Sequence, residues 1–158
     1  MKLELRVAAM LSVGGKLLVQ YRPDVPEEKR VYALAGGHIE PGETMEGALR
    51  REFDEELGLA VEIRGLVCVI ENFWHEGEPY RNSRGELVQP EEVHEIGFYF
   101  DCAPADPEKW HAENGLLRCR EPHIVLALLD PDEAIERLQP EAVREPVAAN
   151  LRSGGLSA

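Results

Sequence analysis

Apolar residues in the first part of the chain are grouped in short runs that predict β-strands. Residues 3–13 are rich in Leu, Val, Ala and Met with partial alternation, and residues 16–21 form a second apolar run. Gly14-Gly15 between them is typical of a tight turn, so the two runs are predicted to form a hairpin. A third short run at residues 31–35 is predicted to be a buried strand.

One segment near the middle of the chain has the period of a helix. Leu49, Phe53 and Leu57 recur at i, i+4 and i+8 and form one apolar face. Thr44 is placed to cap the N-terminus of this helix, and Gly58 is placed to end it in a left-handed conformation. The pattern therefore predicts a helix from Thr44 to Leu57, preceded by a glycine-rich loop at Gly36-Gly37.

The second half of the chain predicts further strands and then helices. Strands are expected at residues 60–74, 94–102 and 123–129, and a polar stretch with glycine and proline at residues 75–90 is expected to be a long hairpin loop. Two short helices are expected near residues 132–138 and 140–151, with Pro140 at a helix start.

This order of elements predicts an α+β (mixed α/β) domain with a largely non-parallel sheet covered by helices. We expect one domain over residues 1–152 and a disordered tail over residues 153–158. The chain has 158 residues, enough for one sizeable core.

The strongly acidic composition argues against some classes of binding partner. The formal net charge is −13, which disfavours binding to nucleic acid or to anionic membranes. The same charge would repel an anionic substrate unless cations neutralise the site.

Cys68, Cys102 and Cys119 have no zinc-site spacing. The start of the chain has no apolar signal core and no run is long enough to span a membrane, so a cytoplasmic setting is expected.

Three carboxylates share one side of the predicted helix. Glu52, Glu55 and Glu56 stand at i, i+3 and i+4, a spacing at which like charges destabilise a helix. A solvated acidic face is one interpretation. A divalent-cation site is the other, because Mg²⁺ prefers hard oxygen ligands and is often held by a few carboxylates together with substrate phosphates.

The surrounding residues favour the cation site, because the stretch from Gly37 to Leu59 resembles the Nudix box. The matching positions follow the family pattern of glycines, glutamates and one arginine at fixed spacing: Gly37, Glu43, Arg51-Glu52, Phe53, Glu55-Glu56, Gly58 and Leu59. The resemblance implies a Nudix-type α/β/α sandwich with a mixed sheet between helices. It also implies a magnesium-dependent pyrophosphohydrolase, with Mn²⁺ as the alternative cofactor.

The resemblance assigns roles to the residues of the box. It implies that Glu52, Glu55 and Glu56 bind the cation, and that the backbone carbonyl of Gly37 joins them. Glu43 and Arg51 resemble the pair that ties the loop to the helix, and we interpret them as structural support.

The implied reaction is attack by water on phosphorus in a diphosphate linkage of a nucleoside diphosphate derivative. A nucleotide sugar such as ADP-ribose, a modified nucleoside triphosphate and a dinucleoside polyphosphate are all open as substrates. The alternative function is an inactive nucleotide-binding regulatory module of the same fold. A homodimer is compatible with the resemblance.

The general base and the substrate contacts are less well defined by the sequence. Glu55 and Glu56 are the candidates for the base within the box, and Glu95 is favoured among four downstream candidates because it begins an apolar strand. The downstream candidates are Glu92, Glu95, Glu113 and Glu121. Arg22 is a candidate for a phosphate contact, and Trp74 and Tyr80 are candidates for stacking on a base.

Overall fold

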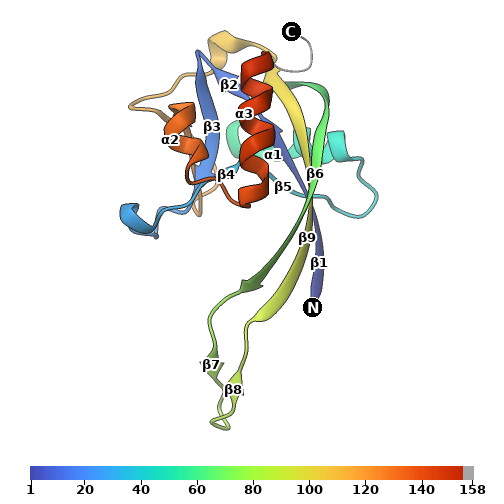
Figure 1. Cartoon of the computed structure of the whole chain (residues 1–158), viewed down its shortest axis with the longest axis vertical. Helices are drawn as coiled ribbons and strands as arrows, with labels where there is room; N and C mark the ends of the chain where they lie inside the picture. Colours follow the sequence, from blue (N-terminus) through green and yellow to red (C-terminus); the bar gives the residue numbers. More distant parts are fainter. Residues whose placement is uncertain (155–158) are drawn as a thin grey trace.

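The computed structural model describes residues 1–154 and contains a four-stranded sheet at its centre (Figure 1). The β1–β9 pair in this sheet is parallel, and the β1–β5 and β6–β9 pairs are antiparallel. The sheet is therefore mixed. Its strand order is β5 (Gly36–His38), β1 (Lys2–Met10), β9 (Glu91–Pro104) and β6 (Val61–Glu76).

A second sheet is antiparallel and has β3 at its centre. The turn between β2 and β3 carries positive φ angles at Gly14 and Gly15, which confirms the predicted turn. Only the end of the first predicted run, Ser12–Val13, pairs with β3. Residues 2–10 form β1 in the other sheet, so the prediction that the whole run pairs in this hairpin is wrong. The strands in order are β10 (Leu116–Leu117), β11 (Val125–Leu129), β3 (Lys16–Tyr21) and β2 (Ser12–Val13), with β4 (Ala33–Leu34) paired to β3.

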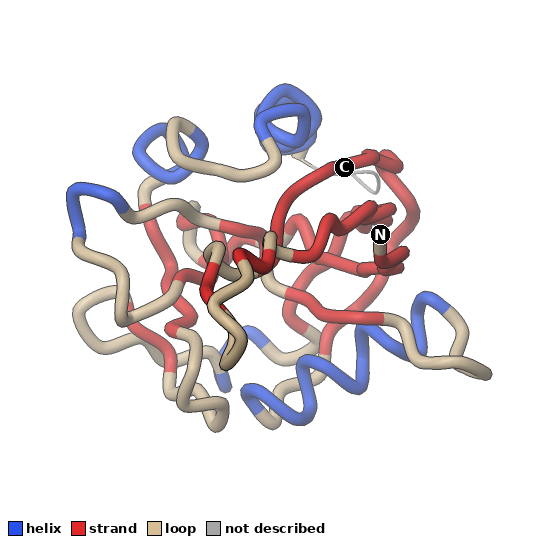
Figure 2. The backbone as a smooth tube through the Cα atoms, turned by 90° about the horizontal axis from the view of Figure 1, so that it is seen from below, coloured by secondary structure: helices blue, strands red, loops and turns tan. Residues whose placement is uncertain are grey.

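The helices lie on both sides of the strands. Figure 2 shows α2 and α3 above the strand layer and α1 below it, so the architecture is the expected α/β/α sandwich. None of the helices within residues 1–154 is long and apolar enough to cross a membrane. The helices are α1 (Met45–Leu57), α2 (Pro131–Ile135) and α3 (Arg144–Ser153), with 3-10 turns η1 (Glu27–Lys29), η2 (Pro107–Lys109) and η3 (Glu141–Val143).

Strand β1 separates two hydrophobic cores. Val7 and Ala9 pack with α1 residues such as Leu49 in one core, whereas Ala8 and Met10 belong to the core on the other side. Successive side chains of a strand point to opposite faces of the sheet. The two faces of β1 are therefore distinct environments, and functional side chains can be placed on either of them.

The Gly36-Gly37 segment is a strand, so the prediction of a loop there is wrong. Residues 36–38 form β5, which pairs with β1 and thereby satisfies its backbone hydrogen bonds. A Cβ at Gly36 would overlap the carbonyl oxygen of Val7. Glycine is needed here for close approach of two backbones, and its presence made the segment resemble a loop.

The predicted long loop at residues 75–90 is more ordered than expected. Strand β6 extends into it as far as Glu76, β9 begins directly after it at Glu91, and its end is a small hairpin of β7 (Tyr80–Arg81) and β8 (Leu87–Val88). Figure 1 shows this hairpin at the end of an arm that projects from the domain. The side chain of Asn82 stabilises the turn by accepting hydrogen bonds from backbone amides on the far side of it.

The C-terminal helices are shorter than predicted. The expected helix near residues 140–151 is divided into η3 and α3, and Pro140 precedes both of them. Ser153, expected in a disordered tail, is the last residue of α3. Gly154 follows as the C-cap of α3 in a left-handed conformation, and the remaining residues of that expected tail, 155–158, lie outside the described residues.

Helix α1 has the predicted ends. Thr44 Oγ1 accepts a hydrogen bond from the Gly47 amide at 3.0 Å, and Gly58 adopts φ 66°. A Cβ at Gly58 would overlap the guanidinium of Arg120, which donates to the carbonyl of Asp54 at 3.3 Å. Glycine is therefore favoured at position 58 for two reasons: the backbone is left-handed, and a side chain there would displace Arg120, which binds a carbonyl group in the last turn of α1.

We expect Gly58→Ala to lower the free energy of unfolding by about 1–2 kcal/mol from the left-handed backbone alone. Displacement of Arg120 should add to this loss. Urea unfolding measures it, with Gly85→Ala as the control because Gly85 also has positive φ (78°) but no atom within 4 Å of the position that a Cβ would take. Equal losses in the two variants would contradict a role for Arg120.

Candidate functional site

Two glutamates of α1 form the centre of the candidate site. Glu52 and Glu56 stand one helical turn apart on the same side of α1, and the Glu52 side chain is only 15% exposed. Strand β5 approaches this side of the helix so closely that a Cβ at Gly37 would overlap the Glu52 carboxyl group. Only glycine at position 37 leaves the Glu52 carboxylate in its observed place.

Arg51 joins three segments around these carboxylates. Its Nε and Nη2 donate to the Glu43 carboxylate at 2.7 and 2.8 Å, and Nη2 also donates to the His38 carbonyl at 2.9 Å. Its Nη1 donates to Glu52 Oε1 at 3.0 Å. The Arg51 guanidinium lowers the pKa of Glu43 to about 2. This network fixes the loop before α1 relative to both β5 and Glu52.

Negative charge is concentrated around Glu56. Burial, first, and then the neighbouring charges of Glu52 and Glu121 together raise the pKa of the Glu56 carboxyl to about 8, against a lowering by Arg6. Two ionised carboxylates at this separation repel each other unless a cation lies between them. The oxygen donors and the space kept by Gly37 therefore fit a hard divalent cation such as Mg²⁺.

We expect the cation-free protein to lose stability as the pH rises from about 4.5 to about 8. The unfolded Glu56 carboxyl loses its proton near 4.5, whereas the folded one keeps it to about 8, so the folded state binds more protons across this window. Stability then falls with rising pH, by about 1–2 kcal/mol after discounting for partial exposure.

Urea unfolding in a chelator at both ends of this window measures the loss, with Glu56→Gln as the control because it cannot titrate. Added Mg²⁺ should restore stability at the upper end of the window. An equally steep fall in Glu56→Gln would show that Glu56 is not its source.

The other candidate carboxylates lie in different environments. Glu55 is 59% exposed and lies 3.3 Å from Arg51. Glu92 is exposed on the arm beside His75, and Glu113 lies in a turn before β10. Glu121, named from the sequence only as a downstream candidate, is close enough to Glu56 to raise its pKa. The structure thus places Glu121, but neither Glu92 nor Glu113, beside the box.

A pocket of about 560 Å³ lies on the other side of the central sheet from α1. It is lined by Arg22 and Trp74, two of the predicted substrate contacts, and by Glu95. The third predicted contact, Tyr80, lies on β7 and is not part of this pocket. An aromatic side chain at a loop boundary can point either way, and the sequence does not distinguish the tyrosines that line the pocket from Tyr80.

Two pocket residues were not identified from the sequence. Gln20 Oε1 and Arg30 Nε are buried and have no hydrogen-bond partner among the described residues, and both residues line the pocket. The Arg30 guanidinium lies over the Tyr21 ring at 4.1 Å from its centroid. A buried acceptor and a buried donor without partners are groups that a polar ligand can satisfy. Arg30 lies in a polar stretch with no motif, so no sequence signal identified it.

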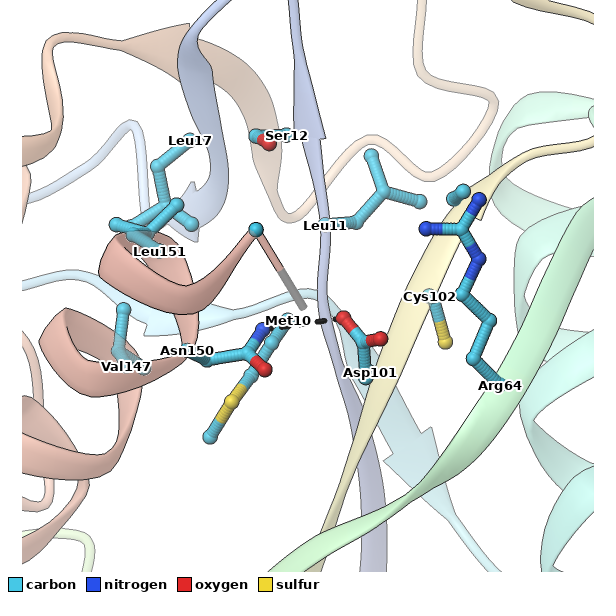
Figure 3. A pocket seen from close by; sticks show the side chains of 12 residues that line it. Met10, Leu11, Ser12, Leu17, Arg64, Asp101, Cys102, Val147, Asn150 and Leu151 are labelled. Carbon is cyan, nitrogen blue, oxygen red and sulfur yellow. Dashed lines mark hydrogen bonds between the residues drawn. The ribbon is translucent and has the colours of Figure 1, made fainter. Parts of the chain in front are cut away.

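A smaller cavity of about 120 Å³ lies between α3 and strands β1 and β9 (Figure 3). The Asn150 side chain crosses to Asp101 there, with Nδ2 donating to Oδ1 at 3.1 Å. Carboxylates of the box do not line this cavity. We interpret the Asn150–Asp101 hydrogen bond as a structural contact that fixes α3 against the central sheet.

Comparison with known proteins gives a match over almost the whole chain. The family model described as NUDIX domain matches residues 2–150. Among solved structures, the E. coli ORF135 protein has a TM-score of 0.56 and 25% identity, covering 97% of this chain and 94% of that one. A MutT protein from Methanosarcina mazei Go1 has a TM-score of 0.62 at 17% identity, covering 97% and 96%, which supports the fold.

Curated relatives match over a shorter region. The nucleoside triphosphatase NudI of Enterobacter sp. (strain 638) is 40% identical over 93 residues, which cover 59% of this chain and 62% of the relative. NudI of Escherichia coli O1:K1 / APEC is 36% identical over 95 residues, covering 60% and 64%. The match therefore spans less than two thirds of the length of these relatives.

Proposed function

Since the chain belongs to the Nudix family, we propose that it is a pyrophosphohydrolase that cleaves a diphosphate linkage in a nucleoside diphosphate derivative with a divalent cation. The observation that carries this proposal is the Glu52–Glu56 pair beside Gly37. Two carboxyl groups are held together at a half-buried position, where burial and the charge of Glu52 raise the pKa of Glu56. Such an arrangement is costly for stability alone and is typical of a functional site.

The proposed ligands of the cation are the carboxylates of Glu52 and Glu56 and the backbone carbonyl of Gly37. Bound there, Mg²⁺, or Mn²⁺ as the alternative, would supply charge neutralisation of phosphate oxygens and a lower pKa of a coordinated water. Glu43 and Arg51 hold the ligands in place through the hydrogen bonds described above. Their role is positioning, because both oxygens of Glu43 are already bound by Arg51.

We assign proton removal from the attacking water to Glu55, the remaining carboxylate on this side of α1. Its side chain is 59% exposed and lies 3.3 Å from Arg51, so its carboxylate can contact a water molecule at the surface of the site. Glu95, the other candidate for the base, is buried and lies beside Glu4 and His38. No covalent intermediate is required by this assignment.

The substrate is proposed to bind in the 560 Å³ pocket, whose lining includes Arg6, a residue whose charge also acts on Glu56 of the box. Trp74 offers an aromatic surface for a base, Arg22 at the rim offers a cation for phosphate, and Gln20 and Arg30 offer the unpaired polar atoms. A nucleoside triphosphate is the first candidate because the curated relatives are named nucleoside triphosphatases. Nucleotide sugars and dinucleoside polyphosphates contain the same linkage and are the other candidate substrates.

The acidic charge of −13 supports a small-molecule substrate in place of nucleic acid or membrane. A cytoplasmic setting and a homodimer stay part of the proposal. Their tests are localisation of the tagged chain and sedimentation of the purified protein.

We expect Trp74→Ala to raise KM by about tenfold with little change in kcat, because stacking on a base contributes about 1–3 kcal/mol. Steady-state kinetics on the best substrate measure the change. Tyr80→Ala is the matched control, since Tyr80 lies outside the pocket and is 60% exposed. An equal rise in KM in the two variants would contradict binding of the nucleotide base in this pocket.

The test of the proposed function is hydrolysis of a panel of nucleoside triphosphates, nucleotide sugars and dinucleoside polyphosphates. Phosphate release is read directly and after phosphatase treatment, with Mg²⁺, with Mn²⁺ and with chelator. Cation-dependent turnover of at least one compound is the expected result. No turnover across the panel, together with measurable nucleotide binding, would favour the inactive regulatory module.

A further inference from the structure

A second group of metal-ligating side chains lies outside the box. Glu4 on β1, His38 on β5 and Glu95 on β9 each offer a ligand atom, and these atoms lie within 4.8 Å of one another. The three residues are far apart in sequence and are brought together by strand pairing, with Glu4 opposite Glu95 and Arg6 opposite His38.

This cluster is on the face of the sheet that is turned away from α1. Ala8 on β1 and Tyr99 on β9 belong to the core on that side, and alternation along the strands places Glu4 and Glu95 on the same face. Gly37, by contrast, faces Glu52 on α1, and the next residue, His38, faces the opposite way. The cluster and the box are therefore separate sites joined by β5.

Both carboxylates of the cluster are buried without full compensation. Glu4 and Glu95 are each 8% exposed. Glu4 Oε2 lies 3.1 Å from His38 Nε2, but the geometry makes no hydrogen bond and this buried oxygen has no other partner among the described residues. No hydrogen bond or ion pair joins the Glu95 carboxylate to another residue in 1–154. Unpaired buried carboxylates are costly unless a cation binds them.

The cations of the protein supply only part of that compensation. Lys2 Nζ lies 2.8 Å from the other oxygen of Glu4 and 3.2 Å from Glu76, at the exposed rim. Arg6 lies on the same face but donates to the carbonyl of Leu34 at 2.6 Å. Glu4 Oε2, Glu95 and the exposed imidazole of His38 are left directed at one another.

We propose that Glu4, His38 and Glu95 bind a divalent transition-metal ion such as Mn²⁺, Co²⁺ or Zn²⁺ at a site separate from the box. One imidazole with two carboxylates is a mixed nitrogen and oxygen donor set, which suits these ions better than Mg²⁺. Glu95 also lines the substrate pocket. An ion here therefore adds positive charge to the wall of a pocket in a strongly acidic protein.

The proposal does not depend on hydrolytic activity, and its test is a binding titration. Co²⁺ is added to the untagged protein in excess Mg²⁺, which fills the box, and the visible d–d absorption of Co²⁺ bound to protein is recorded. We expect a saturable signal in the native protein and in Glu56→Gln. Removing a ligand should cost at least the roughly 10–100-fold in affinity found for residues that only support ligands, so His38→Gln and Glu95→Gln should both bind more weakly.

His75→Gln is the matched control, because His75 and His38 are each 60% exposed and each lies near a glutamate. Loss in His38→Gln with no loss in His75→Gln supports the site. His38 is exposed, so its variant should fold even if a change at Glu95 disturbs the strand. Native Co²⁺ affinity in His38→Gln, or loss of the signal in Glu56→Gln alone, would overturn the proposal.

Discussion

Replacement of Glu56 by Gln is expected to lower kcat/KM by about 100–1000-fold, equivalent to about 3–4 kcal/mol of transition-state stabilisation. The substitution keeps the shape of the side chain and removes one anionic ligand of the proposed cation. Burial and the charge of Glu52 raise the pKa of Glu56, so its ionised form costs stability unless a cation binds it. Steady-state hydrolysis of the best substrate measures the loss of kcat/KM, and Mg²⁺ titration measures the loss of cation affinity.

Glu46→Gln is the control for charge on the same helix, because Glu46 lies in the first turn, is 53% exposed and pairs with Arg50. It should keep near-native activity. In chelator above about pH 8, where the native Glu56 is ionised, the variant at Glu56 should unfold at higher urea than the native protein, because it no longer repels Glu52. Loss of activity together with loss of stability would instead indicate misfolding, and unchanged activity would remove Glu56 from the site.

Replacement of Gly37 by Ala is expected to weaken Mg²⁺ binding by about tenfold or more and to lower kcat/KM by at least as much. A Cβ at this position would overlap the Glu52 carboxyl group, so the Glu52 side chain must turn away from Glu56. Mg²⁺ titration of the native protein and the variant measures the loss. The effect acts through one side chain, because Gly37 is not among the residues with positive φ.

A double-mutant cycle with Glu52→Gln separates this explanation from general damage to β5. If Gly37→Ala acts by displacing Glu52, the two substitutions together should cost much less than the sum of the single effects. Additive losses would indicate that the alanine disturbs the pairing of β5 with β1.

The parts of the fold that depend on neighbouring residues were predictable from the sequence. The hairpin at Gly14-Gly15 and the ends of α1 at Thr44 and Gly58 are set by local backbone chemistry. Strand β5 was not predictable, because it depends on pairing with β1, some thirty residues away. Glycines that permit close approach of two backbones have the same composition as a loop.

The candidate site also has one part that the sequence predicts and one part that it does not. The glutamates of α1 share a helical face, so their proximity follows from their spacing. Glu4, His38 and Glu95 come from three strands, and neither spacing nor composition indicates which residues stand opposite each other across a sheet. Glu4 and His38 consequently received no role from the sequence, and Glu95 was considered only as a base.

The central claim is hydrolysis of a diphosphate linkage that depends on a cation held by Glu52 and Glu56. Its most direct test is phosphorus NMR of the best substrate in ¹⁸O-labelled water with Mg²⁺. We predict loss of the diphosphate resonance and one ¹⁸O in a product phosphate, with neither change in chelator and with both changes at least about 100-fold slower in Glu56→Gln at the same enzyme concentration. Turnover that persists in chelator, or that runs at the native rate in Glu56→Gln, would contradict the claim.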